Sequence, residues 1–137
     1  TRLHCQVISA VREAVGPDFL VALRLGACDY QEGGSTQADA VAACKIFETA
    51  GIDLLDISGG LCGYRGDGSK IPGYFGNESQ AIREAVSVPV ILTGGVRTGL
   101  AAETLLEEGK ADLIGVGRSV LKDSFWAKKA FAELGIE

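Results

Sequence analysis

The sequence contains no methionine and only three prolines in 137 residues. It also lacks any apolar run near the ~20 residues that a membrane-spanning helix needs. No basic segment followed by an apolar one marks the N-terminus as a secretory signal. We therefore expect neither a membrane protein nor a secreted one. Because the initiator methionine is missing and the chain begins inside a helical pattern, we expect a fragment of a longer protein.

Positive charge is scarce as well. The chain has 13 lysines and arginines against 18 acidic residues, a net charge of −5 and a pI near 4.9. This balance argues against nucleic-acid binding and against a membrane-surface role, although it permits one or two arginines facing a small anionic ligand. The high hydrophobic content excludes disorder, and the length alone would suit one domain.

The four cysteines are spread along the chain without a CxxC pair; they are Cys5, Cys28, Cys44 and Cys62. Zinc sites and redox dithiols use closer pairs, so we expect no metal site. Four free thiols in a cytoplasmic protein are expected, although an even count also permits two disulfides.

Hydrophobic periodicity alternates between helical and strand patterns. A stripe of Leu3, Val7, Val11 and Val15 predicts an amphipathic first helix that ends at Gly16. Further helices are expected to open at Thr36, Asn77, Thr98 and Asp123, and strands are expected over 19–25, 52–57, 88–92 and 111–116. The strands are apolar on both faces, which is typical of a parallel sheet covered by helices. The prediction is an α/β fold with four βα units, either an open doubly wound sheet or half of a (β/α)8 barrel.

Arg24 is the first candidate for ligand binding. Both architectures bind ligands beyond the carboxyl ends of their strands, and Arg24 lies near the end of the first one. A lone arginine in an apolar strand needs an acceptor. That acceptor is either an anionic ligand or a nearby carboxylate such as Asp29 or Asp56.

Two glycine-rich turns predict a phosphate site. Gly94 and Gly95 follow the third strand and precede a helix, so their amides can form an anion-binding nest. Gly117 and Arg118 follow the fourth strand, where glycine allows close approach and arginine can bind phosphate with two hydrogen bonds. Together they match the phosphate site that barrels often build after strands 7 and 8. A third glycine-rich segment, 59–76, is expected to be a functional or mobile loop.

In these features the sequence resembles the C-terminal half of an Old Yellow Enzyme-type NADH:flavin oxidoreductase, a member of the FMN-dependent ene-reductase family. The resembling pieces are residues 10–16, the Arg24 strand, 33–36, 50–53, 58–60, 89–95, 112–118 and 123–126. Each piece alone is weak, whereas their common order and spacing make the resemblance specific.

The resemblance implies that residues 1–137 are a single half-barrel fragment that carries the FMN-phosphate loops. It would supply strands five to eight of a (β/α)8 TIM barrel, with parallel strands and outer helices. FMN would be the cofactor, and NAD(P)H the donor of a hydride that passes to activated alkenes such as enones. By this resemblance Arg24 would contact the pyrimidine edge of the flavin. Gly94, Gly95, Gly117 and Arg118 would hold its phosphate.

Members of this family bind the substrate carbonyl with a histidine–histidine or histidine–asparagine pair and use a tyrosine as proton donor. Neither feature has a counterpart in these residues. The catalytic residues are therefore expected in a missing N-terminal half, and the fragment alone is expected to lack turnover. We expect a small-molecule substrate, a cytoplasmic location, and no nucleic-acid or membrane partner. Two alternatives stay open. One is a non-enzymatic half-barrel that forms homo-oligomers through its open barrel face, and the other is a phosphate-binding isomerase or aldolase fragment.

Overall fold

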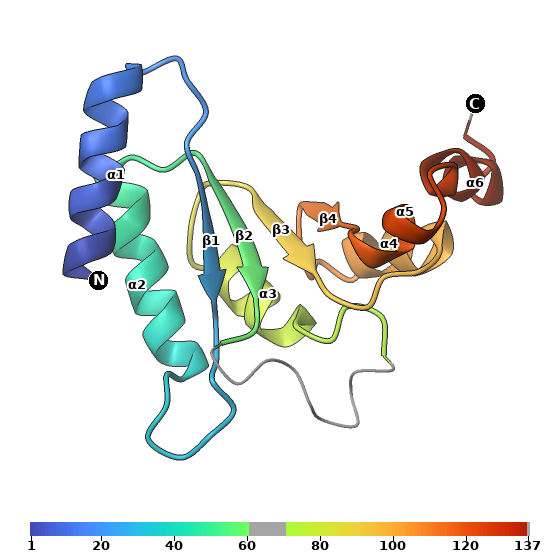
Figure 1. The fold of residues 1–137 in the computed structure, drawn as a ribbon. Helices are drawn as coiled ribbons and strands as arrows, with labels where there is room; N and C mark the ends of the chain where they lie inside the picture. Colours follow the sequence, from blue (N-terminus) through green and yellow to red (C-terminus); the bar gives the residue numbers. More distant parts are fainter. Residues whose placement is uncertain (61–70, 137) are drawn as a thin grey trace.

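The structure, a computed structural model, describes residues 1–60 and 71–136 (Figure 1). Cys62 and most of the glycine-rich segment 59–76 therefore lie outside the described residues. The elements in chain order are α1 (Arg2–Val15), β1 (Ala22–Gly26), α2 (Gln37–Ala50), β2 (Leu54–Ser58), α3 (Gly76–Arg83), β3 (Val90–Thr93), α4 (Gly99–Glu107), β4 (Leu113–Gly115), α5 (Arg118–Lys122) and α6 (Trp126–Glu133).

The order of the strands distinguishes between the two predicted architectures. Four parallel strands pair as β1-β2-β3-β4, each beside the next in the sequence. Connections between parallel strands are almost always right-handed, so successive crossovers in one direction place every helix on the same face of the sheet. A doubly wound sheet would reverse its order and carry helices on both faces. The fold is therefore a segment of a (β/α)8 barrel.

The hydrophobic core lies on the helix-covered face of the sheet. Leu55 and Ile57 of β2 and Val90 of β3 are fully buried. They pack in one cluster with Phe47 of α2 and Ile82 of α3. Side chains alternate between the two faces of a strand, so the positions between these residues belong to the opposite face.

The opposite face carries polar side chains. Arg24, Asp56 and Thr93 occupy it, and none of them is fully buried. Arg24 stands directly opposite Asp56 in the pairing of β1 with β2. Ala22, Leu54 and Ile91 share this face, so it is mixed, and the prediction that the strands are apolar on both faces is only partly right. In a barrel this face looks inward, and near the carboxyl ends it can carry groups that meet a ligand.

Helix α1 is confirmed, but its apolar stripe is not buried by the described residues. Leu3 is 69% exposed and Val7 is 53% exposed, whereas Ile8 is buried. The helix packs on α2, the next helix along the chain. The contact with α2 uses a different face from the one that the stripe marks.

The C-terminal region has one helix more than the sequence predicts. The short α5 begins directly after β4, and its five residues are too few for a periodic hydrophobic pattern. The next helix begins at Trp126 rather than at Asp123. The Asp123 carboxylate accepts a hydrogen bond from the Phe125 amide at 3.0 Å in the turn that separates the two helices.

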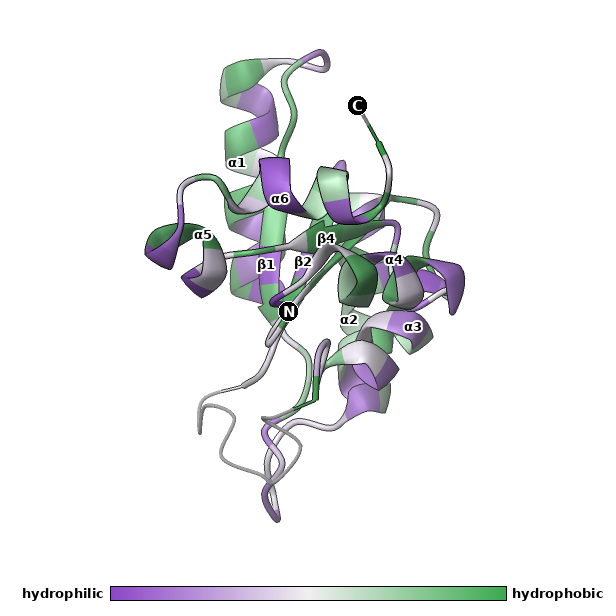
Figure 2. Ribbon diagram, turned by 90° about the vertical axis from the view of Figure 1, so that its right-hand side faces the viewer, coloured by the Kyte–Doolittle hydropathy of each residue, from purple (hydrophilic) through white to green (hydrophobic). Residues whose placement is uncertain are grey.

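The helices show the hydropathy of surface elements. Figure 2 shows that hydrophobic and hydrophilic residues alternate around them. Such helices bury one face and leave the other in water. Within residues 1–60 and 71–136, no helix has both the length and the apolar character that crossing a bilayer requires.

Asp53 joins α1 to the start of the sheet. Its carboxylate accepts a hydrogen bond from the Val21 amide at 2.7 Å and forms an ion pair with Arg12 of α1. Arg12 also donates to the Gly51 carbonyl at 2.7 Å. The Val21 amide and then the Arg12 guanidinium hold the pKa of Asp53 below its ordinary value.

We expect Asp53→Asn to reduce stability at neutral pH and to remove part of the acid sensitivity. The folded-state pKa of Asp53 is lowered. Its ionised form therefore stabilises the fold above the unfolded-state pKa of about 3.9, and this contribution is lost as the pH falls through the folded-state value. Thermal unfolding between pH 7 and pH 2.5 tests this, and the gap between wild type and variant should narrow below about pH 4. A constant gap would contradict the prediction. Asp18→Asn, at an exposed carboxylate in the loop after α1, is the matched control.

Candidate functional site

A cavity of about 840 Å³ opens at the carboxyl ends of β1, β3 and β4. Four of its described lining residues are cationic and none is acidic; the cations are Arg24, Arg97, Arg118 and Lys122. The whole chain has a net charge of −5, whereas the described lining of this cavity is positively charged. Such a cavity favours an anionic ligand.

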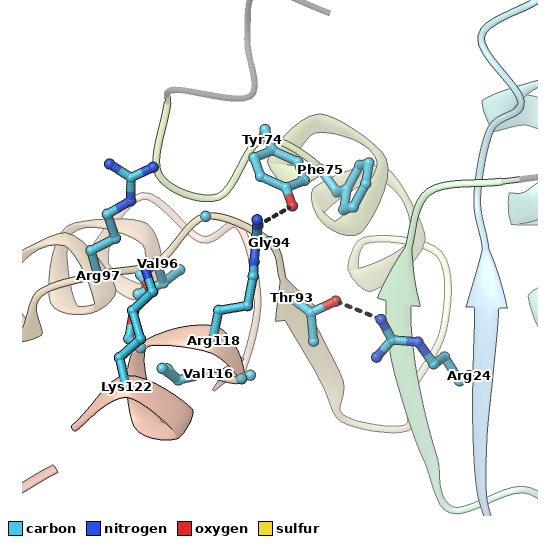
Figure 3. A pocket seen from close by; sticks show the side chains of 14 residues that line it. Arg24, Tyr74, Phe75, Thr93, Gly94, Val96, Arg97, Val116, Arg118 and Lys122 are labelled. Carbon is cyan, nitrogen blue, oxygen red and sulfur yellow. Dashed lines mark hydrogen bonds between the residues drawn. The ribbon is translucent and has the colours of Figure 1, made fainter. Parts of the chain in front are cut away.

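All five residues predicted to bind the cofactor line this cavity; they are Arg24, Gly94, Gly95, Gly117 and Arg118 (Figure 3). They come from β1, from the loop after β3, and from the turn between β4 and α5. The structure therefore brings three separate parts of the chain to one site. Their contact with FMN stays a prediction.

Gly94 and Gly95 form a turn that only glycine can adopt without strain. Their φ angles are +126° and +72°, in the region that other residues rarely occupy. A Cβ atom on Gly94 would lie 2.7 Å from the Tyr74 ring, and one on Gly95 would lie 2.8 Å from it. Neither amide donates a hydrogen bond to another described residue. Two such amides beside cationic side chains have the donor set of an anion-binding nest.

Gly115 and Gly117 have different physical roles. A Cβ atom on Gly115 would lie 2.3 Å from the Thr93 methyl group, so glycine is needed there for β3 and β4 to pair. A Cβ atom on Gly117 would have nothing within 4 Å, and its φ angle of −106° suits any residue. Its small size therefore leaves open space at the cavity rather than meeting a need of the fold.

Arg24 reaches across the open face of the sheet. Its guanidinium pairs with Asp56 and makes a long contact of 3.5 Å with the Thr93 hydroxyl. Thr93 in turn donates to the Ile57 carbonyl at 2.7 Å. Of the two carboxylates considered from the sequence, the structure selects Asp56, since Asp29 accepts a hydrogen bond from the backbone of its own loop. The Arg24 side chain is still 58% exposed, so this pairing leaves it accessible to a ligand.

Nine further described residues line the cavity without having been predicted as site residues, and four of these are aromatic or cationic; the four are Tyr74, Phe75, Arg97 and Lys122. Arg97 follows the glycine pair closely, so the same motif could have indicated it. Tyr74 and Phe75 form an aromatic pair just before a helix, which is a detectable signal within the glycine-rich segment. Lys122 lies on α5, the helix that the periodicity did not reveal.

The three described cysteines do not line this cavity. Cys5, Cys28 and Cys44 are free thiols, as predicted. Burial raises the pKa of Cys44 to about 12, which makes it an unreactive core residue. In the part of the chain that the structure describes, no three His, Cys, Asp or Glu side chains gather to hold a metal ion.

Comparison with known families gives one match that spans the chain. The model of the NADH:flavin oxidoreductase / NADH oxidase family matches residues 1–136. The chain is 37% identical over 134 residues to an NADPH dehydrogenase of Bacillus licheniformis, covering 97% of this chain and 38% of that protein. It is 33% identical over 135 residues to an NADH oxidase of Thermoanaerobacter brockii, covering 94% of this chain and 20% of that protein.

A solved structure agrees with these matches. The fold superposes on a complex of 2-naphthoyl-CoA reductase with a TM-score of 0.86 and 25% sequence identity, covering 98% of this chain and 21% of that one. The chain thus spans between a fifth and two fifths of the length of these relatives.

We expect Gly115→Ala to destabilise the fold and Gly117→Ala to leave its stability unchanged. The first forces a methyl group into Thr93, which costs about 1–3 kcal/mol in a packed interior. The second enters open space, and such changes stay within about 0.5 kcal/mol. Urea unfolding of both variants measures the difference. Equal losses of stability would contradict the contrast between the two glycines.

Proposed function

Because this chain belongs to the NADH:flavin oxidoreductase / NADH oxidase family, we propose that it forms the C-terminal, phosphate-binding part of an FMN-dependent NAD(P)H oxidoreductase. One observation carries the proposal. The Gly94 and Gly95 amides, which donate to no other described residue, line the same cavity as the four cationic side chains. FMN ends in a phosphate, which this donor set would bind well.

The shape of the cavity also suits FMN. Gly117 leaves open space where a phosphate can approach the backbone closely. Arg24 and Arg118 belong to opposite ends of the four-stranded sheet. Three strand spacings separate these ends by about 14 Å. One extended ligand with a phosphate at one end and a ring system at the other would contact both.

Bound FMN would accept a hydride from NAD(P)H and pass it to an activated alkene such as an enone. In this proposal Arg118 and the glycine amides hold the phosphate. Arg24, oriented by Asp56 and Thr93, would place a positive charge at the pyrimidine edge of the flavin. The residues that bind the alkene and donate its proton belong to an N-terminal half-barrel.

A phosphate-binding isomerase or aldolase would use the same glycine turns. Such an enzyme offers no role for a half-exposed arginine on the inner face of the first strand. Arg24 therefore favours FMN over a sugar phosphate. Flavin absorbance of the full-length protein separates the two directly.

We expect Arg118→Ala to weaken FMN binding about 10- to 100-fold, the effect of losing a hydrogen-bonded charge partner. Riboflavin lacks the phosphate, so its affinity should stay unchanged. Titration of flavin fluorescence with the apoprotein measures both ligands. Arg83→Ala is the matched control, because Arg83 pairs with Asp112 and does not line the cavity. An equal loss of riboflavin affinity would contradict the role given to Arg118.

We expect the 137-residue chain alone to reduce a cyclic enone with NAD(P)H at a negligible rate. The polypeptide extended by its N-terminal half-barrel should be yellow and active. Oxidation of NAD(P)H, followed by its absorbance with and without the enone, compares the two proteins. Rapid enone reduction by the 137-residue chain would show that the catalytic groups lie within it.

A further inference from the structure

Tyr74 lies between the glycine turn and Arg118 at the edge of the cavity (Figure 3). A Cβ atom on Gly94 or on Gly95 would come within 2.8 Å of its ring. The ring thus packs directly against both glycines of the turn. Any shift of the ring would change the surface on which the turn rests.

The position of the Tyr74 ring is set from two sides. The amide of the preceding Gly73 donates to the Gly94 carbonyl at 2.8 Å, which ties the two segments together. The ring also makes an edge contact with Phe75, with centroids 4.6 Å apart and planes at 81°. Phe75 is only 6% exposed, and it packs so closely on Gly59 that a Cβ atom there would lie 2.7 Å from its ring. A backbone hydrogen bond and a buried neighbour therefore fix Tyr74.

The phenol oxygen of Tyr74 reaches Arg118. Nη2 of Arg118 donates to this oxygen at 3.2 Å. No carboxylate of the described residues forms an ion pair with Arg118. A free arginine side chain samples many rotamers, and ordering it on binding lowers affinity. The hydrogen bond to Tyr74 restricts those rotamers before a ligand arrives.

We propose that Tyr74 is a positioning residue for the phosphate end of the cavity. Its ring supports the Gly94–Gly95 turn, and its phenol oxygen directs the Arg118 guanidinium toward the same place. The protein then meets an anion with both donor groups already ordered, which reduces the entropy lost on binding. This inference rests on the proposed function, because the anion in question is the phosphate of FMN.

The test is the variant Tyr74→Phe in the full-length protein, with FMN and riboflavin as probes. The variant keeps the ring against the glycines and removes the phenol oxygen. We expect FMN to bind about three- to tenfold more weakly, as for a lost hydrogen bond to a charged group, and riboflavin to bind as before. In an Arg118→Ala background Tyr74→Phe should have no further effect, since the oxygen acts through Arg118.

Tyr30→Phe is the matched control. Tyr30 stacks on Phe75, the same ring that Tyr74 contacts, with ring centroids 6.4 Å apart. Tyr30 does not line the cavity. The control should leave the affinities for both flavins unchanged. Thermal unfolding of each variant confirms that a loss of FMN affinity does not follow from a loss of the fold.

Three outcomes would overturn the inference. Tyr74→Phe could leave the FMN affinity unchanged, could weaken FMN and riboflavin equally, or could act as strongly without Arg118 as with it. The wild-type protein tests the proposed function separately. If it bound FMN no better than riboflavin, the phosphate site itself would be wrong. If wild type prefers FMN and Tyr74→Phe keeps that preference in full, only the role of Tyr74 is wrong.

Discussion

Parallel pairing of neighbouring strands is the constraint on which the whole site depends. Strands that run the same way and follow one another in the sheet bring all their carboxyl ends to one edge. The register places Arg24 opposite Asp56 on β1 and β2, and Thr93 opposite Gly115 on β3 and β4. Each glycine turn then begins where its strand stops. A parallel sheet of reversed order would keep these ends at one edge but would give each strand different neighbours, so the same residues would no longer meet.

The charges of the cavity differ from one end to the other. At the β1 end the charge of Arg24 is offset by Asp56, whose second carboxylate oxygen is buried without a hydrogen-bond partner among the described residues. At the β4 end no described carboxylate pairs with Arg118, and Tyr74 holds it as a neutral acceptor. Because no described carboxylate pairs with Arg118, its full charge is available to attract a dianion, as the proposed phosphate site requires. The proposed flavin ring would carry less charge than the phosphate, so an arginine that Asp56 already partly neutralises would suit the β1 end.

Glycine serves two purposes around this cavity, and only the packing distinguishes them. Gly94 and Gly95 adopt a backbone shape that exposes their amides, and the Tyr74 ring occupies the space where side chains would be. Gly115 allows two strands to approach, whereas Gly117 leaves room. In the sequence all four belong to similar short glycine motifs. Their different roles follow from which neighbour the fold brings to each one.

The sequence alone determined the four strands and most of the helices with their caps, because these signals act over a few residues. It did not reveal α5, and it placed the start of α6 at Asp123 instead of Trp126. Thr36 and Thr98 cap their helices through hydrogen bonds to residues three positions later, as the pattern predicts. The sequence also identified five of the fourteen described residues that line the cavity, since each lies near or just after the end of a strand. Only the tertiary structure decided that the strands stand in chain order, that Asp56 rather than Asp29 holds Arg24, and that Tyr74 contacts Arg118. These features join residues 32 and 44 positions apart. Contacts over such separations depend on how the βα units stack, which no local pattern of residues specifies.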